Sequence, residues 1–376
     1  MKLGIPTETL ETESRVAATP DTVKKLIGLG LEVIVQHGAG ARAHISDEVY
    51  SEAGATIAPS AEETLKDADI VFKVSRPTSE EVGLMKKGAM LAAILSPYAD
   101  ESLLSTYAGQ GVNAFAMEFM PRITRAQSMD VLSSQSNLAG YKAVIDAAAE
   151  YGRAMPMMMT AAGTVAPARV MVMGAGVAGL QAIATAKRLG AIVSATDVRP
   201  AAKEQVESLG GTFVMVESEE TKEAETSGGY AKEMSDEYKK AQAELIAETI
   251  KKQDIVICTA LIPGRAAPVL VSEEMVETMK PGSVIVDLAV EQGGNCPLSK
   301  PGEIVEHNGV TILGHLNVPG RLAADASALY AKNLLNFIEP LIDGETGALQ
   351  IDWEDEIITG TALTKDGAIV HPNFSS

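Results

Sequence analysis

The chain has 376 residues, of which 46% are hydrophobic and 22% are charged, and these proportions exclude disorder along the whole chain. Its formal net charge of −19 at pH 7 makes it a poor candidate for binding nucleic acid or an anionic membrane surface, because both need clustered lysine and arginine. The most apolar region, residues 154–186, is interrupted by prolines and glycines, whereas a membrane span needs about 20 uninterrupted apolar residues, so we expect no direct insertion into a membrane.

Strands alternate with helices over the first third of the sequence, a pattern typical of a parallel sheet with helical crossovers. One helix is predicted to begin at Pro20, because Thr19 can cap it and proline suits the first helical position, and glycines at positions 28 and 30 end it. The other elements predicted in this region are strands at residues 2–6, 31–35, 70–74, 89–95 and 112–117 and helices at residues 46–53 and 61–68.

A polar, irregular segment at residues 121–136 marks the expected boundary between two halves of the chain. A long helix at residues 137–153 and a Met/Ala/Thr connector at residues 155–164 lead into a second alternating series. Its predicted strands are residues 169–173, 191–196, 212–216, 255–259, 283–287 and 310–313, and its predicted helices are residues 177–189, 201–209 and 272–279. A further long helix at residues 323–341 is expected to return the chain to the first half, where a turn at Asp366-Gly367 predicts a C-terminal hairpin.

Residues 217–244 interrupt the second series with a stretch dense in Glu, Lys and Ser. One interpretation is a solvated insertion with a helical end. The other is a mobile lid, in which the pair Gly228-Gly229 beside Tyr230 could let an aromatic side chain close over a ligand.

The strongest motif is Gly174-Ala175-Gly176-Val177-Ala178-Gly179, which follows a predicted strand directly and opens a predicted helix. In a dinucleotide-binding fold the first glycine allows the turn, the second lets the backbone approach a pyrophosphate, and the third lets helix and strand pack closely. The helix N-terminus then offers its N–H groups and its dipole to the phosphates.

Asp197 ends the next predicted strand, 18 residues after Gly179, where such a fold places the carboxylate that binds the adenosine ribose. A carboxylate there repels a 2′-phosphate, which favours NAD over NADP. Arg199 argues the other way, because an arginine can neutralise that phosphate, but Asp197 lies at the strand end itself and carries more weight.

Three loops could complete a cofactor site. Residues 121–130 (PRITRAQSMD) could hold a carboxamide, a ribose and a phosphate, and residues 260–264 and 291–295 follow strand ends, with Leu261 able to pack on a base. The five histidines never pair at i,i+4, so no metal site is predicted.

These patterns predict an α/β protein with two Rossmann-like domains, parallel sheets, two long linking helices and a cofactor in the interdomain cleft. The first domain would comprise residues 1–136 and 322–376, and the NAD(H)-binding domain residues 137–321.

Over essentially its full length the sequence resembles the NAD(H)-binding component of the proton-translocating NAD(P) transhydrogenase family. The resemblance rests on residues 121–141 (PRITRAQSMDVLSSQSNLAGY), 157–164 (MMMTAAGT), 174–190, 196–199, 228–234 (GGYAKEM), 261–264 and 371–372. It implies that this chain binds NAD(H) and passes hydride to NADP⁺ on a partner subunit, while a separate transmembrane subunit moves protons. It also implies a homodimer that is soluble when isolated and lies at the cytoplasmic side of the inner membrane through its partners.

The resemblance assigns Arg122, Gln127 and Asp130 to the loop that holds the nicotinamide end of the cofactor, and these are the predicted catalytic residues. The other residues that it places at the cofactor, together with the glycine motif, are Ser128, Met129, Ser133, Tyr141, Gly174, Gly176, Val177, Gly179, Asp197, Val198, Arg199, Gly229, Tyr230, Gln242 and Leu261.

The related alanine dehydrogenase family shares the two-domain plan and is the main alternative. Arg15 and Lys73 match positions that the dehydrogenase uses, but its catalytic His and Asp align with Ser96 and Glu291 here. Hydride transfer between two nicotinamides needs positioning and no acid or base, which favours the transhydrogenase. A non-catalytic NADH-binding regulatory module is a third interpretation, and it would never transfer hydride to an NADP-loaded component.

Overall fold

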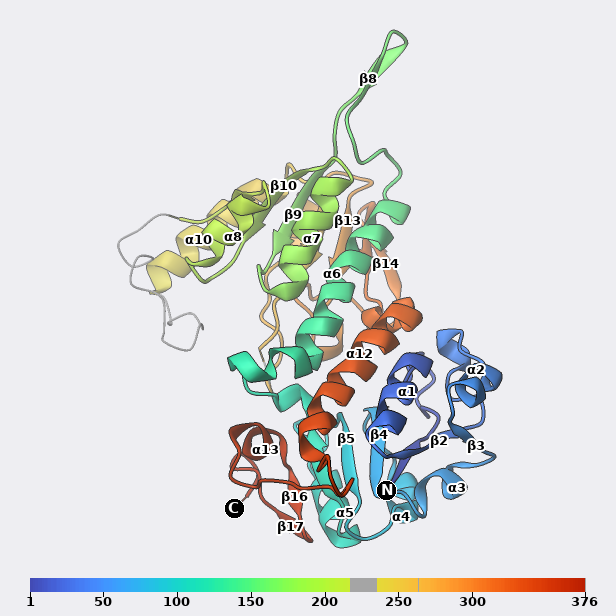
Figure 1. Ribbon diagram of the computed structural model, residues 1–376. Helices are drawn as coiled ribbons and strands as arrows, with labels where there is room; N and C mark the ends of the chain where they lie inside the picture. Colours follow the sequence, from blue (N-terminus) through green and yellow to red (C-terminus); the bar gives the residue numbers. More distant parts are fainter. Residues whose placement is uncertain (217–234, 263, 376) are drawn as a thin grey trace. The chain divides into compact units, whose positions relative to one another are not determined.

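The computed structural model describes residues 1–216, 235–262 and 264–375, which form two compact units (Figure 1). Unit 1 comprises Met1–Gln135 and Pro319–Ser376, and unit 2 comprises Ser136–Val318. Each unit is built around its own sheet, and the strand orders of the two sheets correspond, as the two alternating halves of the sequence predict.

Unit 1 contains six parallel strands in the order β3-β2-β1-β4-β5-β6. Alternate side chains of each strand face opposite layers, so β4 sends Ile70 and Phe72 to one core and Val71 to the other. Helices α1, α2 and α12 complete the first core, and α3, α4 and α5 complete the second. The strands are β1 (Lys2–Ile5), β2 (Glu32–Gln36), β3 (Thr56–Ala58), β4 (Ile70–Ser75), β5 (Met90–Ile94) and β6 (Asn113–Ala116).

The helices of unit 1 include one long segment near the C-terminus, α12, which returns the chain to this unit. They are α1 (Pro20–Gly28), α2 (Asp47–Glu52), α3 (Ala61–Leu65), α4 (Ser79–Leu84), α5 (Ser102–Gln110), α12 (Ala323–Ile338) and α13 (Glu356–Thr361), with short 3-10 turns at Ala41–Ala43, Met117–Phe119, Thr124–Met129 and Glu339–Leu341.

Unit 2 contains a seven-stranded sheet in the order β11-β10-β9-β12-β13-β15-β14. Helices α6, α7 and α8 cover one face, and α10 and α11 cover the other. The strands are β9 (Arg169–Met173), β10 (Ile192–Thr196), β11 (Thr212–Phe213), β12 (Ile255–Cys258), β13 (Val284–Asp287), β14 (Ile304–His307) and β15 (Val310–Leu313). The helices are α6 (Val131–Glu150), which begins in unit 1, α7 (Val177–Arg188), α8 (Ala202–Ser208), α10 (Asp236–Ile250) and α11 (Glu273–Glu277), with a 3-10 turn at Val290–Gln292.

Several sequence predictions need correction. Strand β14 runs antiparallel to β15, which is an exception to the predicted parallel arrangement of this sheet. The segment predicted to be irregular up to residue 136 contains a 3-10 turn, and α6 already begins at Val131 because Asp130 caps it. The second link between the units is the short 3-10 turn Val318–Leu322, and α12 lies wholly in unit 1, so among the described residues only one long helix crosses the boundary.

The connector predicted at residues 155–164 is in fact part of an antiparallel hairpin, β7 (Met158–Thr160) and β8 (Gly163–Val165). Figure 1 shows this hairpin extending from the rest of unit 2. Every residue of both strands is exposed, so no buried face imposes the alternation by which a strand is recognised in a sequence.

The predicted C-terminal hairpin is present as β16 (Thr364–Lys365) and β17 (Ala368–Ile369). Asp366 and Gly367 occupy its turn with φ angles of 48° and 86°, as a tight two-residue turn requires. Thr364 fixes the hairpin beside β6, because its Oγ1 donates to the Val112 carbonyl at 2.7 Å and accepts from the Ala114 N–H at 3.1 Å.

Of the segment at residues 217–244, the structure describes the helical end, α10, whereas residues 217–234 lie outside the described residues. Within the portion of the chain that the structure describes, no helix is both long and apolar enough to cross a membrane.

Candidate functional site

The glycine motif forms the turn between β9 and α7, beside the loop that follows β12. Gly174 has φ = 102°, and a Cβ there would lie 2.6 Å from Thr259 Oγ1. A Cβ on Gly179 would lie 1.8 Å from the Gly174 carbonyl oxygen. The first and third glycines are therefore required by the turn and its packing, whereas the space beside Gly176 is open, as a close approach by a pyrophosphate demands.

The N-terminus of α7 is arranged to attract an anion. The helix runs for 12 residues, has no acidic residue in its first turn, and carries Lys187 and Arg188 in its last turn. The helix dipole and the N–H groups of the first turn therefore present positive charge without a neutralising carboxylate on the same turn. The order of the strands reverses between the parallel strands β9 and β12, and ligands bind at this point in such sheets.

Asp197 follows β10 and forms an ion pair with Arg199. Its carboxylate accepts hydrogen bonds from the Ala175 N–H at 2.7 Å and from Arg199 Nε at 2.9 Å. Burial acts to raise the pKa of Asp197, but the hydrogen bonds from Arg199 and Ala175 outweigh burial and hold the pKa below its ordinary value. The Arg199 charge is thereby compensated within the chain, which favours the NAD(H) interpretation over the NADP(H) one.

Gln242 lies on α10, and its amide is engaged by the ends of two neighbouring strands. Its Oε1 accepts the Val216 N–H at 2.8 Å, and its Nε2 donates to Thr196 Oγ1 at 3.1 Å. Thr196 is the last residue of β10, so Gln242 contacts the side chain directly before Asp197. Val177, Val198 and Leu261 are exposed, with 42%, 64% and 46% of their surfaces accessible, while Gly229 and Tyr230 lie outside the described residues.

The loop assigned to the nicotinamide end lies in unit 1 as a 3-10 turn, Thr124–Met129, held from two sides. Asn333 and Asn336 of α12 both donate to the Ser128 carbonyl, at 2.8 and 2.9 Å. Arg125 makes two hydrogen bonds of 2.7 Å to the Asp355 carboxylate. The loop is therefore fixed by residues far away in the sequence, which local patterns could not reveal.

The predicted residues of this loop have different environments. Arg122 and Gln127 are exposed, and Tyr141, on α6, has 40% of its surface accessible. The Asp130 carboxylate accepts from the Ser133 N–H at 2.9 Å and so caps α6. Met129 is buried in the hydrophobic core of unit 1, so its side chain anchors the loop to that core.

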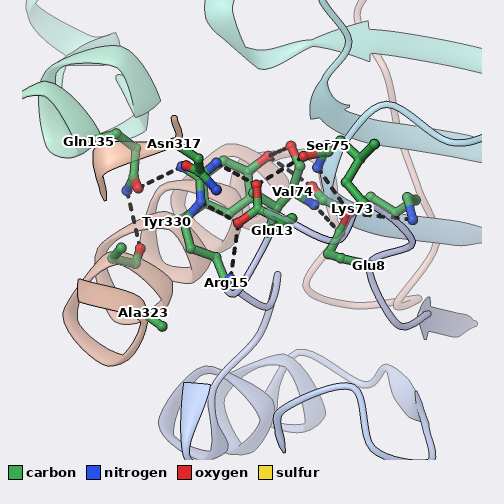
Figure 2. A network of polar contacts seen from close by, with 12 residues as sticks. Glu8, Glu13, Arg15, Lys73, Val74, Ser75, Gln135, Asn317, Ala323 and Tyr330 are labelled. Carbon is green, nitrogen blue, oxygen red and sulfur yellow. Dashed lines mark hydrogen bonds and ion pairs between the residues drawn. The ribbon is translucent and has the colours of Figure 1, made fainter. Parts of the chain in front are cut away.

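A second polar cluster lies in unit 1 where β1 and β4 end (Figure 2). Arg15 is buried and donates two hydrogen bonds of 2.7 Å to Glu13 and one of 2.9 Å to Gln135. Lys73 is completely buried, and its Nζ lies 2.8 Å from Glu81 Oε1 and 3.5 Å from Glu8 Oε2. Both cations are thus compensated by neighbouring carboxylates within unit 1.

Glu8 occupies the position between β1 and β4 at which this type of sheet binds a ligand. Its carboxylate accepts the N–H groups of Val74 at 2.6 Å and Ser75 at 3.3 Å. Burial raises the pKa of Glu8 above its ordinary value, although the charge of Lys73 acts to lower it. The sequence analysis missed Glu8, Glu13 and Glu81, and only the capping pattern from Thr78 to Glu81 could have indicated one of them.

The two positions that align with the catalytic His and Asp of alanine dehydrogenase are occupied by different residues, Ser96 and Glu291. Ser96 is exposed in a left-handed conformation with φ = 47°, and its N–H donates to Glu118. Glu291 is exposed and accepts the Asn317 N–H at 3.1 Å. A serine hydroxyl does not titrate near neutral pH, so the Ser96 side chain cannot replace the histidine as a general acid or base.

Comparisons with known proteins agree over the whole chain. Two family models match, the N-terminal domain of alanine dehydrogenase/PNT at residues 4–139 and its C-terminal domain at residues 143–372. The chain is 61% identical to an NAD(P) transhydrogenase subunit alpha protein of Rhodospirillum rubrum, over 99% of this chain and 98% of the relative.

Solved structures give the same picture. The structure of the transhydrogenase from Sinorhizobium meliloti is similar with a TM-score of 0.90 and 56% identity, over 98% of this chain and 100% of that one. An L-alanine dehydrogenase structure is similar with a TM-score of 0.83 and 27% identity, over 100% of this chain and 98% of that one.

Proposed function

Because this chain belongs to the alanine dehydrogenase/PNT family and its close homologues are alpha subunits of NAD(P) transhydrogenase, we propose that it is the NAD(H)-binding subunit of a proton-translocating transhydrogenase. In this proposal it passes hydride from NADH to NADP⁺ held on a partner subunit, and a separate transmembrane subunit couples the transfer to proton movement. The chain would lie at the cytoplasmic side of the inner membrane through these partners.

The observation that carries the proposal is the glycine turn of unit 2 beside the Asp197–Arg199 ion pair. The open space at Gly176 and the N-terminus of α7, whose first turn has no acidic residue, suit a pyrophosphate, and the Asp197 carboxylate suits ribose hydroxyls. Unit 1 supports the proposal because its corresponding position is not open to a dinucleotide. Its corresponding position is taken by the Glu8 carboxylate, so the described residues offer one dinucleotide site and the second nucleotide must come from a partner.

Hydride transfer between two nicotinamides requires the protein to orient the rings. NADH supplies the hydride, and direct transfer to a second nicotinamide exchanges no proton at the reacting carbons. In the proposal Arg122, Gln127 and Asp130 fix the direction of the nicotinamide ring, and Asn333 and Asn336 fix the backbone that carries them. Reacting carbons about 3–3.5 Å apart are then sufficient for transfer, with no acid or base at Ser96.

The proposed homodimer rests on the hairpin β7–β8. Met157 and Met159 have 60% and 72% of their surfaces accessible on this projecting arm. Apolar side chains gathered on an exposed strand pair are typical of a protein interface, and in a twofold dimer each arm would pack on the second copy.

The proposal is tested by adding a separately prepared NADP⁺-loaded partner subunit to this chain and NADH. The chain alone should bind NADH without oxidising it, and NADPH should form only after the partner is added. NADH oxidation by the chain alone, or no NADPH in the mixture while NADH is bound, would contradict the proposal.

A further inference from the structure

The loop that follows β12 begins in contact with the glycine turn. Thr259 Oγ1 donates to the Gly174 carbonyl at 3.0 Å, and the Thr259 N–H donates to the Met173 carbonyl at 2.9 Å. The next residues, Leu261 and Ile262, expose 46% and 43% of their surfaces. Two exposed apolar side chains therefore follow directly after the residues that contact the glycine turn.

The strand order indicates which end of a dinucleotide these side chains meet. Such a sheet has two halves, each of which takes one mononucleotide, with the ligand lying across the point where the strand order reverses. The half formed by β9, β10 and β11 carries Asp197 and takes the adenosine end. The half formed by β12, β13 and β15 is left for the nicotinamide end, and the loop after β12 belongs to it.

The side chain of Asn295 holds both ends of this loop. Asn295 is completely buried, its Oδ1 accepts the Ala260 N–H at 3.1 Å, and its Nδ2 donates to the Ala260 carbonyl at 2.9 Å and to the Pro268 carbonyl at 2.8 Å. The amide thus pairs with the backbone of Ala260 as a neighbouring strand would. Carbonyl partners on one side and an N–H partner on the other require both the nitrogen and the oxygen of an amide.

Asn295 is itself fixed by Asp287 at the end of β13. Asp287 Oδ1 accepts the Asn295 N–H at 3.1 Å, and Oδ2 accepts the Cys296 N–H at 3.0 Å and the Ser299 hydroxyl at 2.6 Å. Gly294 has φ = 81°, and a Cβ there would lie 2.8 Å from Asp287 Oδ2. Asp287, at the end of β13, therefore anchors the backbone that carries the amide.

We propose that Asn295 is a positioning residue of the cofactor site, which fixes the loop after β12 so that Leu261 packs against the nicotinamide end of NAD(H). This inference rests on the proposed function, because it requires a dinucleotide across the glycine turn. It assigns Asn295 no contact with the cofactor, only control of the loop that makes the contact.

The test compares two ligands on the full-length chain by titration calorimetry. ADP-ribose has the adenosine, both phosphates and both riboses, and differs from NADH in lacking the nicotinamide. Asn295→Asp keeps the size and the acceptor but turns both donated hydrogen bonds into repulsion. Asn308→Asp, at an exposed turn between β14 and β15, is the matched control.

We expect Asn295→Asp to raise the Kd for NADH by about tenfold or more, the effect of losing one or two hydrogen bonds that hold the loop, and to leave the Kd for ADP-ribose within about twofold. Asn308→Asp should change neither constant. If thermal unfolding shows that Asn295→Asp is not folded, the test uses Asn295→Ser instead, which is smaller and uncharged. Leu261→Ala removes an exposed side chain and should give the same selective loss.

Equal weakening of both ligands by the Asn295 variants would assign Asn295 a general structural role and overturn the inference. Unchanged NADH affinity in these variants, or in Leu261→Ala, would also overturn it. Each of these results leaves the proposed function intact, because the unaltered chain still binds NADH. Failure of the unaltered chain to bind NADH would instead overturn the proposed function, and this inference with it.

Discussion

In the proposed function, the Asp197 side chain sets the cofactor preference in two ways. Its carboxylate can accept hydrogen bonds from ribose hydroxyls. Its ion pair with Arg199 also engages the guanidinium group that could otherwise bind a 2′-phosphate. We predict that Asp197→Ala weakens NADH binding by about 1.5–3 kcal/mol, the value of a hydrogen bond to a charged group, and relaxes discrimination against NADPH because Arg199 is released. Calorimetry with both nucleotides measures this. Asp325→Ala, at an exposed aspartate, is the control, and unchanged affinities would remove Asp197 from the site.

The pH dependence of this ion pair has a definite sign. The pKa of Asp197 is lowered below its ordinary 3.8 in the folded chain, so the ionised carboxylate stabilises the fold. This stabilisation is complete above the unfolded-state pKa and is lost as the pH falls through the folded-state pKa. We predict that the difference in the free energy of unfolding between the unaltered chain and Asp197→Asn is constant above about pH 5 and shrinks progressively as the pH falls below that value. Urea titrations across this range measure it, and a difference that shrinks at higher pH would be the wrong result.

Gln127 is exposed on a loop whose backbone is held by α12, so its side chain can be changed without disturbing the core. If the loop orients the nicotinamide, Gln127→Asn shortens its reach and misplaces the ring, and a displacement of about 1 Å costs on the order of a hundredfold in rate. Affinity should hardly change, because the pyrophosphate and adenosine ends supply most of it. Single-turnover transfer to a partner's NADP⁺, beside the Kd for NADH, measures both. A proportional fall in the two would make the loop a binding element only.

Among the elements, the hairpin β7–β8 lends itself to a direct test. Each side chain such as Met159 would contribute about 1.5–3 kcal/mol when buried against a second copy. We predict that Met157→Glu with Met159→Glu converts a homodimer into a monomer in sedimentation experiments, because two carboxylates would be buried on each arm. The side chains are exposed, so folding should be unaffected. Leu10→Glu, at an exposed position of unit 1, should leave the dimer intact, and a dimer in the arm variant would contradict the proposed interface.

Local patterns located the elements that are buried in a core and failed for those without a buried face. Strand β9 was predicted with its observed bounds, Arg169–Met173, because an apolar run ends at a glycine turn. The hairpin β7–β8 is exposed throughout, and β14 is a partly exposed edge strand, so neither has the periodicity of a core element. Strand β14 was therefore not predicted, and its antiparallel pairing with β15 is the exception to the predicted parallel sheet.

The contacts that complete the candidate site span long sequence separations. Gln135 reaches Arg15 across 120 residues, and Asn333 reaches Ser128 across 205. No spacing rule connects such residues before the fold is known. The glycine motif and Asp197 could be found because their geometry is set by one strand, one turn and the next strand.

At the scale of the whole chain, the two sheets have corresponding strand orders but carry different residues at the position where the strand order reverses. The ligand position of unit 2 has a glycine turn, an open approach at Gly176 and a positive helix end. In unit 1 the segment Pro6-Thr7-Glu8 follows β1 at the corresponding position. The Glu8 carboxylate fills this position and accepts the N–H groups of Val74 and Ser75. In the proposed function, the described residues offer one dinucleotide site, and a partner presents the second nucleotide.

The most direct measurement follows deuterium from NADH labelled at one face of C4, in a mixture of this chain with an NADP⁺-loaded partner subunit. The account predicts that the label appears in NADPH without exchange with solvent, from one face of NADH only, and that L-alanine supports no reduction of NAD⁺. Label lost to water, or reduction of NAD⁺ by L-alanine at about 1 per second or faster, would contradict it.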